Sequence, residues 1–201
     1  MNSPRFPRLV VATRNPGKLM ELAGGLTGFD PPLLLSAVSE WPESVDVPET
    51  GATCRENARQ KAMAGLAVTG LPSLADDTGL EVDALDGAPG VHSARYAGPD
   101  ANPAGNIQKL LKALDGVPDA RRTARFRCVL ALALPGTTEP EYVEGIVEGS
   151  ISREPRGEGG FGYDPIFVVT EVGRTMAELS VDEKASLSHR ARALRELRRR
   201  L

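Results

Sequence analysis

The hydrophobic pattern near the amino terminus predicts a buried strand followed by a helix. Residues 9–12 form a short apolar run with two valines, which is typical of a buried strand. The polar segment TRNPG over residues 13–17 ends this run, and the apolar positions that follow Lys18 predict a helix. A strand, a polar turn and a helix start in this order make an αβ element that can hold an anion.

The rest of the chain alternates between helical and strand patterns. Thr53, with Glu56 three residues later, matches a capping box and predicts a long helix that ends near Gly70. Residues 73–75 are a short predicted strand that runs into Asp76, and alternation resumes at 80–82. Further strands are predicted at 125–134, 142–151 and 166–169, and further helices at 106–114 and from about Asp182 to the end.

This mixture predicts an α/β fold built on a mixed sheet that is flanked by helices. Residues 42–51 are expected to form a loop or edge strand, and the glycine- and proline-rich residues 86–105 an irregular segment. Neither a repeat nor a long linker divides the chain. Residues 1–201 are therefore interpreted as a single domain.

Composition narrows the classes of function. The chain has 24 basic and 27 acidic residues, a balance that argues against broad electrostatic binding to nucleic acid. Its apolar runs are too short for a signal peptide or a membrane span. The two cysteines, Cys54 and Cys128, are too few for a disulfide framework. We therefore expect a cytoplasmic protein that binds neither nucleic acid nor membrane.

The turn after the first strand is a candidate phosphate site. The N–H groups at the helix start and the charge of Lys18 can attract phosphate, and Thr13 and Asn15 can add hydrogen bonds. The segment lacks the spacing of a Walker A loop. Taken alone, it is better interpreted as a structural turn.

The acidic pair Asp76 and Asp77 is a candidate metal site. Magnesium is commonly bound through one or two carboxylates together with substrate phosphates. Neighbouring residues in a strand point to opposite faces, so one of the pair is expected to enter the site. A turn formed before Gly79 explains the same residues equally well. Glu49 and Lys61 are weaker candidates when each is considered by itself.

Two later segments can contact a nucleotide. The glycine-rich residues 159–165 contain Phe161 and Tyr163, whose rings can stack on a base, although a hairpin with two core aromatics fits as well. The segment 183–190 offers charge and directed hydrogen bonds, or is simply a solvated helical face. His92 and His189 form no metal-binding cluster in the sequence, which argues against zinc chemistry.

Four groups of motifs, in this order, resemble the inosine triphosphate pyrophosphatase family. They are ATRNPGKLMEL, ETGATCRENARQKA, LADDTGLEVDALDGAPGVHSARYAG, and the pair GGFGYDPIF and ELSVDEKASLSHRARAL. Together they cover nearly the whole chain. The resemblance implies a homodimer with an elongated mixed sheet and an active-site cleft between two lobes. It also implies Mg²⁺-dependent hydrolysis of deaminated purine nucleoside triphosphates (ITP, dITP, XTP, dXTP) to the monophosphate and pyrophosphate, which cleanses the nucleotide pool.

The resemblance further implies roles for individual residues. Asp77 binds magnesium and acts as the base toward water, with Asp76 beside it, and Glu49 is the acidic metal or water partner. Pro48 stands where another acidic residue is often found, so the full carboxylate set stays open. The substrate-binding residues that it implies are Thr13, Arg14, Asn15, Pro16, Gly17, Lys18, Lys61, Thr78, Phe161, Gly162, Tyr163, Asp164, Lys184, His189 and Arg190.

Within this set, residues 13–18 and Lys61 hold the phosphates, and the residues from Phe161 onward contact the base and sugar. A donor such as Arg190, or a backbone N–H, can pair with the 6-oxo group of hypoxanthine or xanthine. Against the amino group of adenine the same donor is left unpaired, which costs about 1–3 kcal/mol when it is buried.

Two rival functions are compatible with parts of this pattern. A nucleotide sensor can use the same pocket without hydrolysis, but binding alone does not require a base near a metal. Another metal-dependent phosphohydrolase or a sugar-nucleotide enzyme can also be built around an acidic pair. The segment Asp76–Thr78 lacks the DxDx[TV] spacing of an aspartyl-phosphate enzyme, and no REx₂EE-like helix occurs in the sequence.

Overall fold

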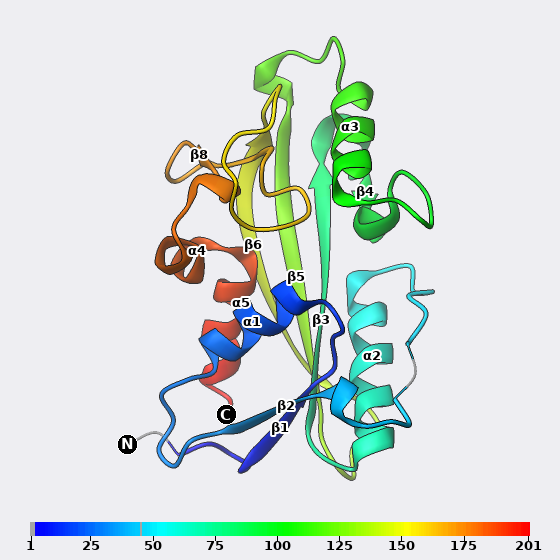
Figure 1. Ribbon diagram of the computed structural model, residues 1–201, viewed down its shortest axis with the longest axis vertical. Helices are drawn as coiled ribbons and strands as arrows, with labels where there is room; N and C mark the ends of the chain where they lie inside the picture. Colours follow the sequence, from blue (N-terminus) through cyan, green and yellow to red (C-terminus); the bar gives the residue numbers. More distant parts are fainter. Residues whose placement is uncertain (1–2, 45) are drawn as a thin grey trace. The chain divides into compact units, whose positions relative to one another are not determined.

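A computed structural model describes residues 3–44 and 46–201, and within them the strands form one mixed sheet (Figure 1). The strands are β1 (Arg8–Val11), β2 (Leu34–Ala37), β3 (Ser73–Val82), β4 (Pro89–Gly90), β5 (Thr123–Ala133), β6 (Glu141–Ile151), β7 (Phe167–Val169) and β8 (Arg174–Thr175). Their order is β2-β1-β3-β5-β6-β7-β8, and β4 pairs with β3. β1 is parallel to β2 and β3, whereas the pairs β3–β4, β6–β7 and β7–β8 are antiparallel. The predicted α/β fold with a central mixed sheet is confirmed.

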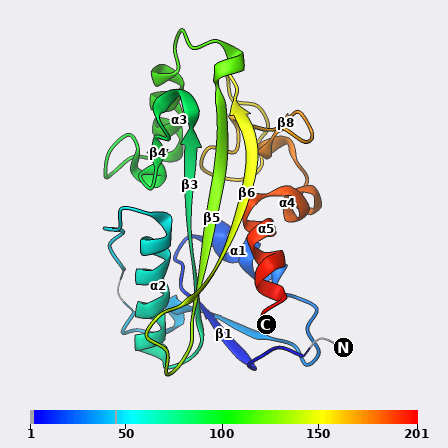
Figure 2. The ribbon, with the colours of Figure 1, turned by 180° about the vertical axis from the view of Figure 1, so that it is seen from behind.

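The helices lie on both faces of the sheet (Figures 1 and 2). They are α1 (Pro16–Gly25), α2 (Cys54–Thr69), α3 (Pro103–Ala113), α4 (Val181–Leu187) and α5 (His189–Arg198). Short 3-10 segments occupy Val38–Glu40, Asp83–Leu85, Ser93–Arg95, Asp119–Arg121 and Met176–Glu178. In the part of the chain that the structure describes, no helix has both the length and the apolar character needed to cross a membrane.

The chain divides into two compact units, each with its own apolar core. Unit 1 comprises Met1–Asp77, Cys128–Gly145 and Arg190–Leu201, and unit 2 comprises Thr78–Arg127 and Ile146–His189. The core of unit 1 includes Leu9, Leu74 and Leu194, and that of unit 2 includes Leu80 and Phe167. Strands β3, β5 and β6 contribute residues to both units. The interpretation of residues 1–201 as one pyrophosphatase domain stays a prediction.

In unit 1, neighbouring side chains of β3 point to opposite faces of the sheet and therefore contact different helices. Leu74 belongs to a cluster that contains Leu22 of α1 and Leu194 of α5. Ser73 faces α2 instead, because a Cβ atom added to Gly65 of that helix would lie 2.3 Å from the Ser73 hydroxyl oxygen. This two-residue period also separates the acidic residues that follow on the same strand.

The structure excludes one alternative that the sequence left open and contradicts one prediction of local structure. The acidic pair does not interrupt the strand: β3 runs unbroken from Ser73 to Val82, so the alternative of a turn is excluded. The predicted carboxy-terminal helix is divided into α4 and α5, because Ser188 adopts an extended conformation with ψ 158°. A backbone in this conformation does not continue the helical hydrogen bonds, so α5 begins anew at His189.

Helix α4 begins with a capping box that is sensitive to pH. The Ser180 hydroxyl accepts the Glu183 N–H at 3.2 Å, and the Glu183 carboxylate accepts the Ser180 N–H at 2.8 Å. The ion pair with Arg174 and the Ser180 N–H lower the pKa of Glu183 to about 2. A depressed folded-state pKa means that this stabilisation is complete above the unfolded pKa and is lost as the pH falls toward 2.

We therefore expect the variant Glu183→Gln to unfold at a lower temperature than the wild type at pH 7. The difference should shrink as the pH falls below about 4.3, the ordinary value for glutamate, and should vanish near pH 2. Thermal unfolding of both proteins across this range checks the expectation. Glu154→Gln, at an exposed position, serves as the control. A difference that does not depend on pH would contradict this account of the cap.

Candidate active site

Two buried carboxylates at the centre of β3 take their partners from different helices. Asp76 is 1% exposed and Asp77 is 4% exposed. Asp76 contacts Lys18 of α1 and Arg190 of α5, whereas Asp77 contacts Lys61 of α2. The expectation that strand neighbours point to opposite faces is thus matched by their contacts. All of these residues belong to unit 1.

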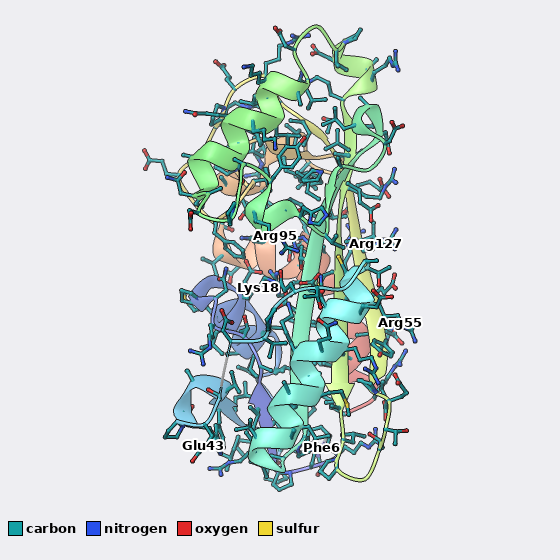
Figure 3. All side chains as sticks on the ribbon, turned by 90° about the vertical axis from the view of Figure 1, so that its right-hand side faces the viewer. Phe6, Lys18, Glu43, Arg55, Arg95 and Arg127 are labelled. Carbon is teal, nitrogen blue, oxygen red and sulfur yellow. The ribbon has the colours of Figure 1, made fainter. Side chains whose placement is uncertain are left out.

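Asp76 is held by two cations. Its Oδ2 atom lies 3.2 Å from Lys18 Nζ and 3.0 Å from Arg190 Nη2, and Arg190 also pairs with Glu21. Burial acts to raise the pKa of Asp76, but the charges of Lys18 and Arg190 outweigh it and hold the pKa well below its usual range. Asp76 is therefore an ionised group whose position is set by its partners. Figure 3 labels Lys18 on α1.

Lys61 bridges the other two carboxylates of the site. Its Nζ atom lies 2.8 Å from Asp77 Oδ1 and 2.9 Å from Glu49 Oε1. For Glu49, burial acts to raise the pKa, but the neighbouring ammonium of Lys61 brings it below its ordinary value. For Asp77, burial dominates, and together with the nearby Glu49 charge it raises the pKa despite Lys61 and Lys18. Two carboxylates in similar surroundings thus differ in their affinity for a proton.

The turn between β1 and α1 is shaped by its own side chains. Asn15 caps the helix, since its Oδ1 atom accepts the Lys18 N–H at 3.1 Å, and Pro16 occupies the first helical position. The Thr13 hydroxyl accepts the Asn15 N–H at 3.2 Å. Arg14 donates to the Ser44 carbonyl at 2.8 Å. These bonds fix the first turn of α1, including Gly17, so that the Lys18 side chain reaches Asp76.

In unit 2, the glycine-rich segment 159–165 forms a loop that contacts α4. Lys184 Nζ lies 2.8 Å from Asp164 Oδ2 and 4.8 Å from the centre of the Phe161 ring. The same carboxylate accepts the Phe161 N–H at 2.9 Å. Gly160, with φ 76°, leaves no room for a side chain, because an added Cβ would lie 2.1 Å from Asp164 Oδ2. The structure thus brings Phe161, Asp164 and Lys184 together, and Gly162 lies between the first two in the loop.

The remaining ring residues of that set are buried in unit 2. Tyr163 is 5% exposed, and its hydroxyl donates to the Ser93 carbonyl at 2.9 Å. His189 stacks on Phe126 with the ring centres 4.7 Å apart. Tyr163 and His189 therefore support the surrounding structure through their rings. Thr78 belongs to the same unit and is the residue of β3 that follows Asp77.

Sequence reasoning missed two side chains at this site. Glu21 pairs with Arg190, and Asn57 donates to Asp77 at 3.4 Å. The spacing of Glu21 and Asn57 along their helices could have indicated both residues. Glu21 follows Lys18 by three residues on α1, and Asn57 precedes Lys61 by four residues on α2, so each shares a helix face with a predicted site residue.

Comparisons with known proteins identify the family to which the chain belongs. A model of the Ham1 family matches residues 9–200. The chain belongs to the Ham1 family. This Ham1-family chain is 54% identical over 191 residues to a dITP/XTP pyrophosphatase of Syntrophobacter fumaroxidans, covering 95% of this chain and 80% of the relative. It is 53% identical over 191 residues to one of Geobacillus kaustophilus, covering 94% and 91% of the two chains.

Solved structures of the family agree with the fold. A HAM1 protein from Coxiella burnetii is 45% identical and superposes with a TM-score of 0.87, over 96% of this chain and 98% of that one. A nucleoside-triphosphatase, dITP/XTP pyrophosphatase, from Mycobacterium abscessus is 47% identical with a TM-score of 0.76, over 94% and 98%. The family resemblance that the motifs predicted for this Ham1-family chain is confirmed.

Proposed function

We propose that this Ham1-family chain hydrolyses deaminated purine nucleoside triphosphates (ITP, dITP, XTP and dXTP) to the monophosphate and pyrophosphate. The observation that carries the proposal is the set in which the half-buried Lys61 bridges Glu49 and the buried Asp77, with Lys18 paired to the adjacent Asp76. Such a set combines cations for phosphate with a carboxylate for water. The dITP/XTP pyrophosphatases among its relatives point to the same substrates.

The residues of this set fit Mg²⁺. Glu49 Oε1 and Asp77 Oδ1 lie 2.9 and 2.8 Å from the same Lys61 nitrogen, so two hard oxygen donors are close to each other. Within the described residues there is no group of three or more His, Cys, Asp or Glu arranged for a metal ion. Mg²⁺ is commonly bound through one or two carboxylates, completed by phosphate and water. We propose that Asp77 and Glu49 hold it, and that it neutralises phosphate charge when bound.

Asp77 is the proposed general base. In the proposed reaction a water oxygen forms a bond to the phosphorus of the α phosphate, and the water proton passes to the Asp77 carboxylate. The anhydride bond between the α and β phosphates breaks, and its oxygen leaves with the electron pair. Lys61 and Lys18 supply positive charge as negative charge develops on the phosphate oxygens.

The substrate contacts of the remaining residues are proposed by resemblance. Residues 13–18 and Lys61 hold the phosphates, and Thr78 also contacts the substrate. The sugar and base are contacted by the segment 161–164, Lys184, His189 and Arg190. In the structure the Arg190 guanidinium is directed to Asp76 and Glu21. Its pairing with the 6-oxo group of the base stays a prediction. So do the homodimer and the cytoplasmic location.

Pyrophosphate release tests the proposal directly. We expect magnesium-dependent release from dITP and XTP, with the monophosphate as co-product, and much weaker release from ATP and GTP. Each nucleotide is assayed with Mg²⁺ and with a chelator. Binding without release would favour the nucleotide sensor. Orthophosphate in place of pyrophosphate would mean that a different bond is broken, and the mechanism given above would be wrong.

A further inference from the structure

A fully buried asparagine lies against the acidic pair and has no part in the reaction as described so far. Asn57 is 0% exposed and sits in the second turn of α2. Buried amides are stable only when their polar atoms are hydrogen-bonded. Here the oxygen accepts the Gly51 N–H at 2.8 Å, and the nitrogen donates to Asp77 Oδ2 at 3.4 Å. The amide therefore joins a loop to a strand.

Asn57 and Lys61 contact different oxygens of the same carboxylate. They are four residues apart on α2 and so lie on one face of the helix. Lys61 binds Asp77 Oδ1 at 2.8 Å, and Asn57 reaches Oδ2. A carboxylate held at both oxygens by two side chains of one helix has little freedom to rotate.

The oxygen of Asn57 holds the loop that carries Glu49. A Cβ atom added to Gly51 would lie 2.7 Å from Asn57 Oδ1 and 2.6 Å from Glu56 Cβ, so the loop backbone packs directly on α2. The Glu56 carboxylate adds a second tie, since it accepts the Ala52 N–H at 2.7 Å. Glu49 precedes Gly51 by two residues. Its distance from Asp77 is thereby tied to the position of α2.

We propose that Asn57 is a positioning residue that fixes the direction of the Asp77 carboxylate and anchors the loop that carries Glu49. The inference deepens the proposed function and rests on it, because the purpose of the fixed direction is proton transfer from water to Asp77. Asparagine suits both bonds, since its amide presents one acceptor and one donor. Aspartate retains the acceptor for Gly51 but places a negative charge against Asp77.

Two variants remove one or both of the hydrogen bonds that the Asn57 side chain makes. Asn57→Asp keeps the shape and the acceptor but loses the donor, and Asn57→Ala loses both. We expect kcat to fall about 10- to 100-fold in both variants, with KM changed far less, because misdirection of a reacting group affects the chemical step. Gln60→Ala is the matched control: Gln60 lies on the same helix and donates to Thr50 of the same loop at 3.3 Å. Its kcat should stay close to that of the wild type.

Asn57→Asp with wild-type kcat would overturn the proposal, since the donor to Asp77 would then be dispensable. Crystal structures of the wild type and of Asn57→Asp give a test that is independent of activity. We expect the Asp77 carboxylate to be rotated in the variant while Gly51 stays in place, and an unmoved Asp77 would overturn the proposal. A wild type that releases no pyrophosphate would defeat the proposed function instead, and the structures would still decide whether Asn57 positions Asp77.

Discussion

Asp77→Asn is expected to lower kcat by about 10²–10⁴-fold, the contribution typical of a general base. The amide has nearly the shape of the carboxylate but does not accept a proton from water. It also offers one oxygen where Lys61 Nζ and Asn57 Nδ2 both require an acceptor. One of these donors then faces an NH₂ group. Steady-state kinetics with dITP and Mg²⁺ measure the loss.

Nucleotide binding should survive in this variant, because Lys18, Lys61 and the turn over residues 13–18 are unchanged. Calorimetric titration with dITP in the presence of Mg²⁺ checks this expectation. Asp100→Asn, the same chemical change at an exposed position in unit 2, is the control and should retain full turnover. Near-normal turnover of Asp77→Asn would remove Asp77 from the role of base.

Arg190→Met is expected to produce the largest loss of stability. Arg190 and Asp76 are both buried, with side chains 1% and 0% exposed. Removing one partner of a buried pair destabilises a protein by as much as about 3–5 kcal/mol, and here it leaves the buried Asp76 carboxylate with Lys18 as its remaining cation. For a chain of this size the melting temperature should fall by roughly 6–20 °C. Thermal unfolding followed by circular dichroism measures the change.

The second substitution Asp76→Leu should restore part of the stability lost in Arg190→Met. A buried ion pair replaced by apolar side chains of similar size is often neutral or even stabilising, because neither charge then has to leave water. Arg199→Met is the matched control, since Arg199 follows α5 and pairs with Glu196 at an exposed position. It should change stability little. Equal losses for Arg190→Met and Arg199→Met would contradict the assigned role of the buried pair.

Local patterns in the sequence are sufficient for most of the secondary structure and for part of the site. The helix start at Thr53 is confirmed: its hydroxyl accepts the Glu56 N–H at 3.1 Å. The other half of the predicted capping box differs, since Glu56 binds the Ala52 N–H, one residue before the cap. These contacts join residues that are a few positions apart, so the sequence alone specifies them closely.

Ambiguities remained where local patterns have more than one solution. Asp76 and Asp77 are compatible with a turn or a strand, and only pairing within the sheet decides for the strand. The apolar stripe from Leu187 to Leu201 predicts one helix, yet the chain is extended at Ser188. Strand β2, absent from the prediction, is similarly specified by its parallel pairing with β1. Pairing between distant segments outweighs local propensity in β2 and β3.

The sequence by itself determined the fold class, the helix start at Thr53 and the family, because periodicity, caps and ordered motifs depend on residues that are close together in the chain. The tertiary structure alone decided which charges meet. Arg190 lies 114 residues from Asp76 along the chain and Lys61 lies 16 from Asp77, yet each pair is in hydrogen-bond contact. Burial raises the pKa of Asp77, whereas the charges of Lys18 and Arg190 outweigh burial and lower the pKa of Asp76. Such differences depend on which charges are adjacent in a medium that screens them weakly, and no local pattern encodes that.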